Sequence, residues 1–125
     1  MQKEKALQLA DSLKAKIEHI SGVDYLETDC SDLGADMVKD MAFKFKSEYP
    51  RICFVAYGTQ EGKVNLTLML GDQLVAEGKD ASKIIRQASK NIKGGGGGQK
   101  HFATAGGKDA SGIATAVEEI KEQVF

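Results

Sequence analysis

The apolar positions of the chain recur with two periods, one typical of helices and one typical of strands. Over residues 3–20 they recur every three or four positions and Gly22 follows, which predicts a helix at the start of the chain. The same spacing predicts helices over residues 34–48, 81–92 and 113–124. Each of these helices has one apolar face that must pack against another element.

Three of the predicted helices follow a residue that suits an N-cap. Ser31 or Asp32 can cap the second helix, Asp80 the third and Ser111 the last. Such side chains accept hydrogen bonds from the free N–H groups of the first helical turn. They set the expected starts of the helices.

Residues 51–57 form an almost continuous run of apolar, β-branched and aromatic residues, which predicts a central strand buried on both faces. Residues 63–70 alternate between apolar and polar, so they predict a half-buried strand that forms a hairpin with its predecessor through a turn at residues 58–62. Shorter strands are predicted at residues 23–28 and 74–76. The fold class is therefore α+β: a small mixed β-sheet covered by helices and preceded by one N-terminal helix.

The chain has 125 residues, the size of one domain that can bury a core without a disulfide or a metal ion. It contains no run of about 20 apolar residues, and its first residues are charged rather than built around an apolar signal core. We therefore expect a cytoplasmic protein with no membrane segment. Because its apolar stripe begins immediately after Met1, the first helix looks like the end of a longer one, with a native start as the alternative.

Cysteine use agrees with that compartment. Cys30 and Cys53 are far apart in the sequence, and neither lies in a C-x-x-C pair or near His19 or His101. A zinc site needs four ligands in close pairs, so we expect two reduced, partly buried thiols and neither a metal nor another cofactor.

Basic residues concentrate in one part of the chain, although the net charge is only -1. Between Asp80 and Asp109 there is no acidic residue, while the remainder of the chain is acidic in balance. The basic residues of this segment are Lys83, Arg86, Lys90, Lys93, Lys100 and Lys108. A positive segment in an acidic body is the usual footprint of a phosphate-rich partner, and a solvated helix face is the alternative.

Glycines concentrate in the same segment. Five are consecutive, from Gly94 to Gly98, and Gly106 and Gly107 follow a run of small residues. Such a run can adopt positive φ and present N–H groups to an anion in a concave nest; a flexible linker is the alternative. Because ordering glycine costs much conformational entropy, we expect a mobile loop in the free domain unless neighbouring backbone groups hold it.

Catalytic motifs do not fit this segment. A P-loop ending at Lys108 would need glycine at Phe102 and serine or threonine at Asp109, and the glycine run fits no G-x-G-x-x-G register. His101 has no carboxylate near it in the sequence, so a polar structural position or a contact to a phosphate or base is favoured over acid–base catalysis.

The segment from Gly94 to Gly112 combines, in order, a glycine run, a short spacer, a small-residue run, Gly-Gly-Lys-Asp and Ser-Gly before the last helix. This order resembles the glycine-rich signature of the C-terminal domain of alanyl-tRNA synthetase, whose fold is shared with the C-terminal domain of DHH phosphoesterases. The resemblance covers the whole chain. It implies that residues 1–22 are the end of a helical arm and that residues 23–125 form the globular domain with the glycine-rich motif.

In that family the domain is a tRNA clamp that contacts the outer corner of the tRNA and supports aminoacylation and editing, and in some members it contributes to dimerisation. The resemblance therefore implies three partners: alanine tRNA, the rest of a synthetase chain and a second copy in a homodimer. The implied nucleic-acid contacts are Arg86, Lys90, Lys93, Gly94, Gly95, Gly96, Gly97, Gly98, Gln99, Lys100, His101, Gly106, Gly107 and Lys108. Gln99 departs from the pattern, because many relatives have arginine just after the glycines.

The sequence contains neither the Asp-His-His motif of a two-metal phosphoesterase nor the zinc motif of an editing domain, and an adenylate-forming domain does not fit in its length. We therefore expect no catalytic residue in this chain and interpret it as part of an alanine–tRNA ligase. Two alternatives stay open: an assembly module that self-associates through residues 3–20 and the sheet edges, and the substrate-holding domain of a phosphoesterase.

Overall fold

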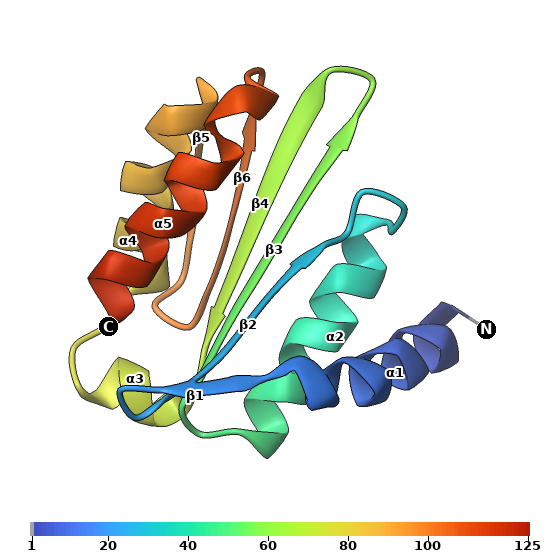
Figure 1. Cartoon of the computed structure of the whole chain (residues 1–125), viewed down its shortest axis with the longest axis vertical. Helices are drawn as coiled ribbons and strands as arrows, with labels where there is room; N and C mark the ends of the chain where they lie inside the picture. Colours follow the sequence, from blue (N-terminus) through green and yellow to red (C-terminus); the bar gives the residue numbers. More distant parts are fainter. Residues whose placement is uncertain (1) are drawn as a thin grey trace.

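The computed structural model describes residues 2–125 and contains one six-stranded sheet with helices on both faces (Figure 1). The strands are β1 (Glu18–Ile20), β2 (Val23–Asp29), β3 (Ile52–Gln60), β4 (Lys63–Leu70), β5 (Gly95–Gly98) and β6 (Phe102–Gly107). The helices are α1 (Gln2–Leu13), α2 (Ala35–Glu48), α3 (Asp72–Ala76), α4 (Ala81–Ala88) and α5 (Ile113–Val124), with 3-10 turns at Lys14–Lys16, Ser89–Ile92 and Ala110–Gly112. The predicted α+β class is confirmed. Among the described residues, no helix is long and apolar enough to span a membrane.

The sheet is mixed because α2 connects its parallel pair of strands. The strand order is β1-β2-β3-β4-β6-β5, and β2 runs parallel to β3 with Leu26 opposite Phe54. The other neighbouring pairs are antiparallel, and the pairing of β3 with β4 forms the centre of the sheet. The turn predicted at residues 58–62 is shorter in the structure, because β3 continues in register to Gln60 opposite Lys63.

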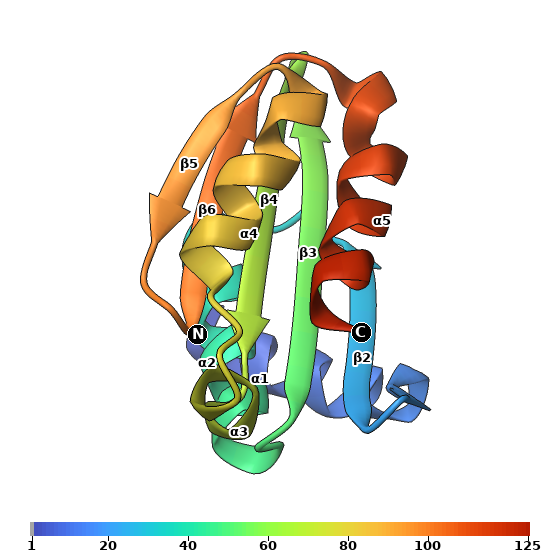
Figure 2. The ribbon, with the colours of Figure 1, turned by 90° about the vertical axis from the view of Figure 1, so that its left-hand side faces the viewer.

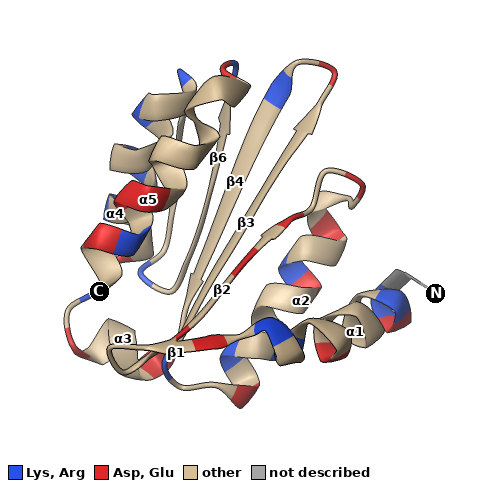
Figure 3. Cartoon of the chain, in the orientation of Figure 1, with Lys and Arg blue, Asp and Glu red and all other residues tan. Residues whose placement is uncertain are grey.

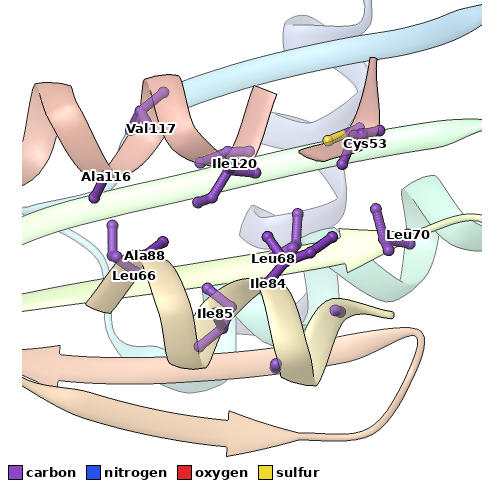
Figure 4. Close-up of a cluster of buried hydrophobic side chains, with 14 of the residues drawn as sticks. Cys53, Leu66, Leu68, Leu70, Ile84, Ile85, Ala88, Ala116, Val117 and Ile120 are labelled. Carbon is purple, nitrogen blue, oxygen red and sulfur yellow. The ribbon is translucent and has the colours of Figure 1, made fainter. Parts of the chain in front are cut away.

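Each face of the sheet carries its own core. On one face, α4 and α5 cover the side chains of alternate residues in the central strands, such as Cys53, Val55 and Leu68 (Figures 2 and 4). On the other face, α2 covers Phe54 and Met69, and α1 packs against α2 in the same core. Since β3 is buried on both sides, the prediction of a central strand is confirmed.

The prediction that residues 63–70 form a half-buried strand is right in its bounds and wrong in its burial. On the face predicted to be polar, Thr67 is only 8% exposed and Met69 is fully buried. α2 packs against that face of β4, so the strand lies between two helical layers.

The first helix is shorter than predicted. α1 ends at Leu13 and a 3-10 turn follows, after which Glu18–Ile20 form β1 instead of a last helical turn. Ser21 and Gly22 have φ values of 53° and 75°, as in a two-residue hairpin turn, and fold β1 back onto β2. The apolar face of α1 still packs against α2, in the core on the α2 side of the sheet.

The short strand predicted at residues 74–76 is also wrong. Residues Asp72–Ala76 form α3, in which Leu74 is buried and the N–H of Gln73 donates to the carbonyl oxygen of Pro50. A segment of so few residues has no periodicity that separates a strand from a helical turn.

Two predicted N-caps are replaced by other residues. α2 begins after Gly34, which makes no side-chain cap hydrogen bond, and the Ser31 hydroxyl donates to Asp29 instead of capping the helix. The last helical segment begins with a 3-10 turn capped by Asp109, whose carboxylate accepts from the N–H of Ser111 at 3.1 Å. Ser111 therefore lies inside that turn.

Both cysteines are free and buried. Burial raises the pKa of the Cys30 thiol to about 11 and that of the Cys53 thiol to about 12. At neutral pH both thiols stay protonated, and the thiolate is the reactive form, so neither is placed or charged for nucleophilic chemistry.

The predicted N-cap of α4 is confirmed and gives a first prediction. Asp80 accepts a hydrogen bond from the N–H of Lys83 at 3.3 Å. Asp80→Ala should lower the free energy of unfolding by about 0.5–2 kcal/mol. Asp80→Asn should leave the free energy of unfolding nearly unchanged, because asparagine is an equally good cap. Urea unfolding of the three proteins measures this; an equal loss in both variants would contradict the capping role.

Candidate nucleic-acid interface

The glycine run forms the edge strand of the sheet. β5 pairs antiparallel with β6, with Gly96 opposite Ala105, and the N–H of Gln99 donates to the carbonyl oxygen of Phe102 at the hairpin tip. The alternative of a flexible linker is therefore wrong. The sequence predicts a mobile loop unless neighbouring backbone groups hold the run. Pairing with β6 holds it, so the run is an ordered strand.

Backbone hydrogen bonds anchor this hairpin at both ends to the segment that contains α4. At one end, the N–H of Ala81 donates to the carbonyl oxygen of Lys100 at 2.8 Å. At the other end, the N–H of Lys108 donates to the carbonyl oxygen of Ile92 at 2.8 Å. Because α4 also packs along β5 (Figure 2), the hairpin and the helix form one unit.

The predicted anion nest does not form. A nest is formed by successive N–H groups of residues that alternate between right- and left-handed conformations or form a turn. Among the five consecutive glycines, Gly98 has a positive φ of 156°, and the others do not. The run offers a ligand an extended strand edge without side chains instead of a concave loop.

Alternate glycines of the run meet different surroundings. A β-carbon on Gly94 would lie 1.8 Å from the carbonyl oxygen of Gly106, and one on Gly96 would lie 2.1 Å from that of Thr104. Both positions therefore need glycine for β5 to approach β6. A β-carbon on Gly95 would have nothing within 4 Å, and one on Gly97 would meet ordinary contacts, the nearest being Arg86 Nε at 3.5 Å. The fold does not require glycine at positions 95 and 97.

The cations of the segment are exposed and lie on α4, on the 3-10 turn that follows it and at the ends of the hairpin (Figure 3). They are Lys83, Arg86, Lys90, Lys93, Lys100 and Lys108. Among residues 2–125, none of the six forms an ion pair, whereas Lys14 is 2.8 Å from Glu48 and Lys46 is 3.0 Å from Asp72. The positive charge of this side of the molecule is therefore left uncompensated by direct contacts.

A hollow of about 640 Å³ lies at the end of the hairpin where β5 begins. The predicted residues that line it are Lys93, Gly94, Gly106, Gly107 and Lys108. Lys63 lines it as well, and Glu61 is the acidic residue in this part of the described chain that does so. Sequence reasoning missed Lys63, which reaches the hollow because Val64 of β4 pairs with Gly107 of β6. Three lysines therefore surround glycine backbone that carries no side chains, an arrangement suited to binding a phosphate group.

The structure does not bring all predicted residues together. Arg86 lies on the α4 side of the hairpin, next to Gly97. His101 lies on the α2 side, where its ring centroid is 6.1 Å from that of Phe43 in an edge-to-face arrangement. Gln99 and His101 line a separate hollow there. The predicted set is therefore divided between two faces of one hairpin.

The acidic groups near this region do not form a metal site within the described part of the chain. Within residues 2–125, no three His, Cys, Asp or Glu side chains cluster so as to hold a metal ion. The Ser111 hydroxyl donates to Asp109 and holds the pKa of that carboxyl below its usual value, with a smaller contribution from Lys93. Asp109 is therefore a charged cap at neutral pH and no proton donor.

Residues 22–124 match the family model of the DHHA1 domain. The chain belongs to the DHHA1 family. This DHHA1 domain is 43% identical over 121 residues to the alanine–tRNA ligase of Bacteroides thetaiotaomicron, a match that covers 96% of this chain and 14% of the relative. It is 42% identical over 123 residues to the alanine–tRNA ligase of Parabacteroides distasonis, covering 98% of this chain and 14% of the relative. The chain thus spans about 14% of the length of these relatives.

Solved structures share the fold of the DHHA1 domain. The C-Ala domain of Aquifex aeolicus alanyl-tRNA synthetase is similar with a TM-score of 0.77 and 20% identity, covering 86% of this chain and 96% of that one. The DHH domain of a member of a family of ribosomal proteins has a TM-score of 0.69 and 15% identity, covering 98% of this chain and 30% of that one. The predicted resemblance to the C-terminal domain of alanyl-tRNA synthetase is confirmed.

The two classes of glycine give a second prediction. Gly96→Ala should lower the free energy of unfolding by about 1–3 kcal/mol, because its methyl group forces β5 away from β6. Gly95→Ala, the matched control, should change it by less than about 1 kcal/mol and in the stabilising direction, since alanine lowers the entropy of the unfolded chain. Thermal and urea unfolding of both variants measure the difference. Equal effects would contradict the assignment of a close backbone contact to Gly96 and not to Gly95.

Proposed function

We propose that this DHHA1 domain binds tRNA as part of an alanyl-tRNA synthetase. The proposed contact surface, called the α4–hairpin surface below, consists of Arg86, Lys90, Lys93, Gly94, Gly95, Gly96, Gly97, Gly98, Lys100, Gly106, Gly107 and Lys108. The observation that carries the proposal is a strand without side chains, bordered by exposed cations that form no ion pair among residues 2–125. The names of the relatives, alanine–tRNA ligases, give the class of RNA.

The α4–hairpin surface suits an RNA backbone because phosphates need positive charge and close approach. Lysine and arginine neutralise phosphates with release of counterions, and backbone N–H groups can donate to phosphate oxygens. β5 has four residues, so the bare strand is roughly 13 Å long and can follow only a few nucleotides. A short contact of this kind recognises the shape of an RNA rather than its sequence.

We further propose that the surface contacts the outer corner of the L-shaped tRNA in the cytoplasm and so supports aminoacylation and editing by the remaining domains. Footprinting of an unmodified alanine tRNA transcript tests this. Protection of the corner is expected. Protection confined to the acceptor stem would contradict the proposed position, and protection nowhere would contradict tRNA binding. Sedimentation of the free domain tests the alternative of an assembly module, which requires self-association without RNA binding.

A third prediction concerns the cations. Replacing Lys90, Lys93 and Lys100 together with alanine should weaken binding about equally for different tRNAs and reduce the log-affinity against log-salt slope by up to about 0.9 per lost duplex contact. Stability should change by only a few tenths of a kcal/mol per substitution, because all three side chains are exposed. The matched control replaces Lys3, Lys5 and Lys16, which are exposed on the N-terminal side. Equal loss in both triple variants would indicate a general charge effect and contradict the surface.

A fourth prediction concerns the glycine that the fold does not require. Gly95→Val should leave the domain folded, since its β-carbon would meet nothing within 4 Å and valine favours strands. It should nevertheless weaken tRNA binding, because the isopropyl group keeps a phosphate backbone away from β5. Filter binding beside a melting curve measures both effects. Unchanged binding with an unchanged melting temperature would show that the RNA does not approach β5.

A further inference from the structure

A second hollow lies on the other face of the hairpin, between β5, β6 and α2. It has a volume of about 410 Å³, within the range of sites that hold small ligands. Its lining residues are Lys39, Phe43, Gly97, Gly98, Gln99, His101, Phe102, Ala103 and Thr104. Two residues of α2, Lys39 and Phe43, thus face the glycine strand, although no motif in the sequence connects them to it.

Phe43 is one of two large apolar side chains exposed within the described chain, with 39% of its surface accessible. Other aromatic rings hold it in place from the side of the hairpin. The centroid of the Phe102 ring is 5.4 Å from that of Phe43, with an angle of 49° between the ring planes. The centroid of the His101 ring is 6.1 Å from that of Phe43, with an interplanar angle of 76°. An aromatic ring that is positioned by its neighbours yet open to solvent is a surface on which another ring can stack.

The rest of the lining supplies polar groups at the rim. Lys39 contributes a positive charge, Gln99 an amide and Thr104 a hydroxyl, and no acidic residue of the described chain lines the hollow. Gly97 and Gly98 line the hollow with backbone alone, so no side chain from these two residues enters it. A flat ring with hydrogen-bonding edges and an attached phosphate combines these requirements.

We propose that this hollow binds one unpaired nucleobase of the RNA, stacked on Phe43, with Lys39 near the adjoining phosphate. The inference rests on the proposed function, because Gly97 and Gly98 belong both to this hollow and to the α4–hairpin surface. An RNA backbone that follows β5 can therefore turn a base over the edge strand towards α2. Base-paired nucleotides keep their rings inside the helix, so the site selects unpaired ones.

The test compares Phe43→Ala with Phe125→Ala, the matched control, in the 125-residue domain. Phe125 is 41% exposed and packs edge-to-face on Tyr25, away from the hairpin. The probes are an oligouridylate, a blunt RNA duplex and an alanine tRNA transcript. Phe43→Ala should weaken binding of the oligouridylate by about 5- to 150-fold, the range for one stacked base, with an unchanged salt slope. Binding of the duplex should change little, and Phe43→Tyr should restore oligouridylate binding.

A direct contact is measurable as well. In the complex with the oligouridylate, NMR should show nuclear Overhauser effects between the Phe43 ring protons and a base proton. Equal weakening by Phe43→Ala and Phe125→Ala, or equal weakening for oligouridylate and duplex, would overturn the stacking site. So would wild-type RNA binding by Phe43→Ala together with a loss of self-association, which would make the surface a protein contact.

The outcomes separate this inference from the proposed function. If the unmodified domain binds tRNA through its cations while Phe43→Ala binds the oligouridylate normally, the stacking site is wrong and the function stands. If the unmodified domain binds none of the three RNAs at any salt concentration, the proposed function fails, and the stacking site fails with it.

Discussion

The close approach of β5 to β6 is the constraint on which the arrangement of this side of the molecule depends. β-Carbons at positions 94 and 96 would lie within about 2 Å of carbonyl oxygens of β6, so only glycine permits the pairing. Hydrogen bonds from Ala81 to the Lys100 carbonyl and from Lys108 to the Ile92 carbonyl then join the hairpin to both ends of the α4 segment. The distances between the cations of α4 and the bare strand follow from these backbone contacts.

The side of the molecule that carries the α4 segment and the hairpin differs from the rest in its ion pairing. Lys14 and Lys46 are paired with carboxylates on the side of α1 and α2, and Arg51 is paired with Glu77. Exposed pairs of this kind add little to stability, but they cancel local fields. The six cations of the α4 segment and the hairpin have no such partners among residues 2–125, so direct contacts leave their positive charge uncancelled. A nearly neutral chain can in this way carry one basic face.

The sequence predicted the elements whose signals are local and repeated. The helix over residues 34–48, the two central strands and the Asp80 cap depend on periodicity or on one side chain near its own backbone. The errors in the type of element fall on segments of three to five residues, such as Glu18–Ile20 and the glycine strand, whose identity depends on a partner strand. For the candidate site, composition singled out the glycine segment and its cations, but it predicted a loop where the structure has a β-hairpin. It could not identify Lys63 or Phe43, because only sheet pairing and helix packing bring them there.

The alternation of the glycines links the fold to the proposed contact with RNA. A strand directs successive residues to opposite faces, so one glycine run can meet two separate requirements at alternate positions. Positions 94 and 96 meet the requirement of the sheet. Glycine at positions 95 and 97 destabilises a strand by roughly 0.5–1 kcal/mol relative to alanine. No close packing contact in the free domain requires glycine there, so nothing in the fold offsets this cost. Under the proposed function, close approach of RNA to the strand would offset this cost, at positions that lie beside cations without an ion pair among residues 2–125.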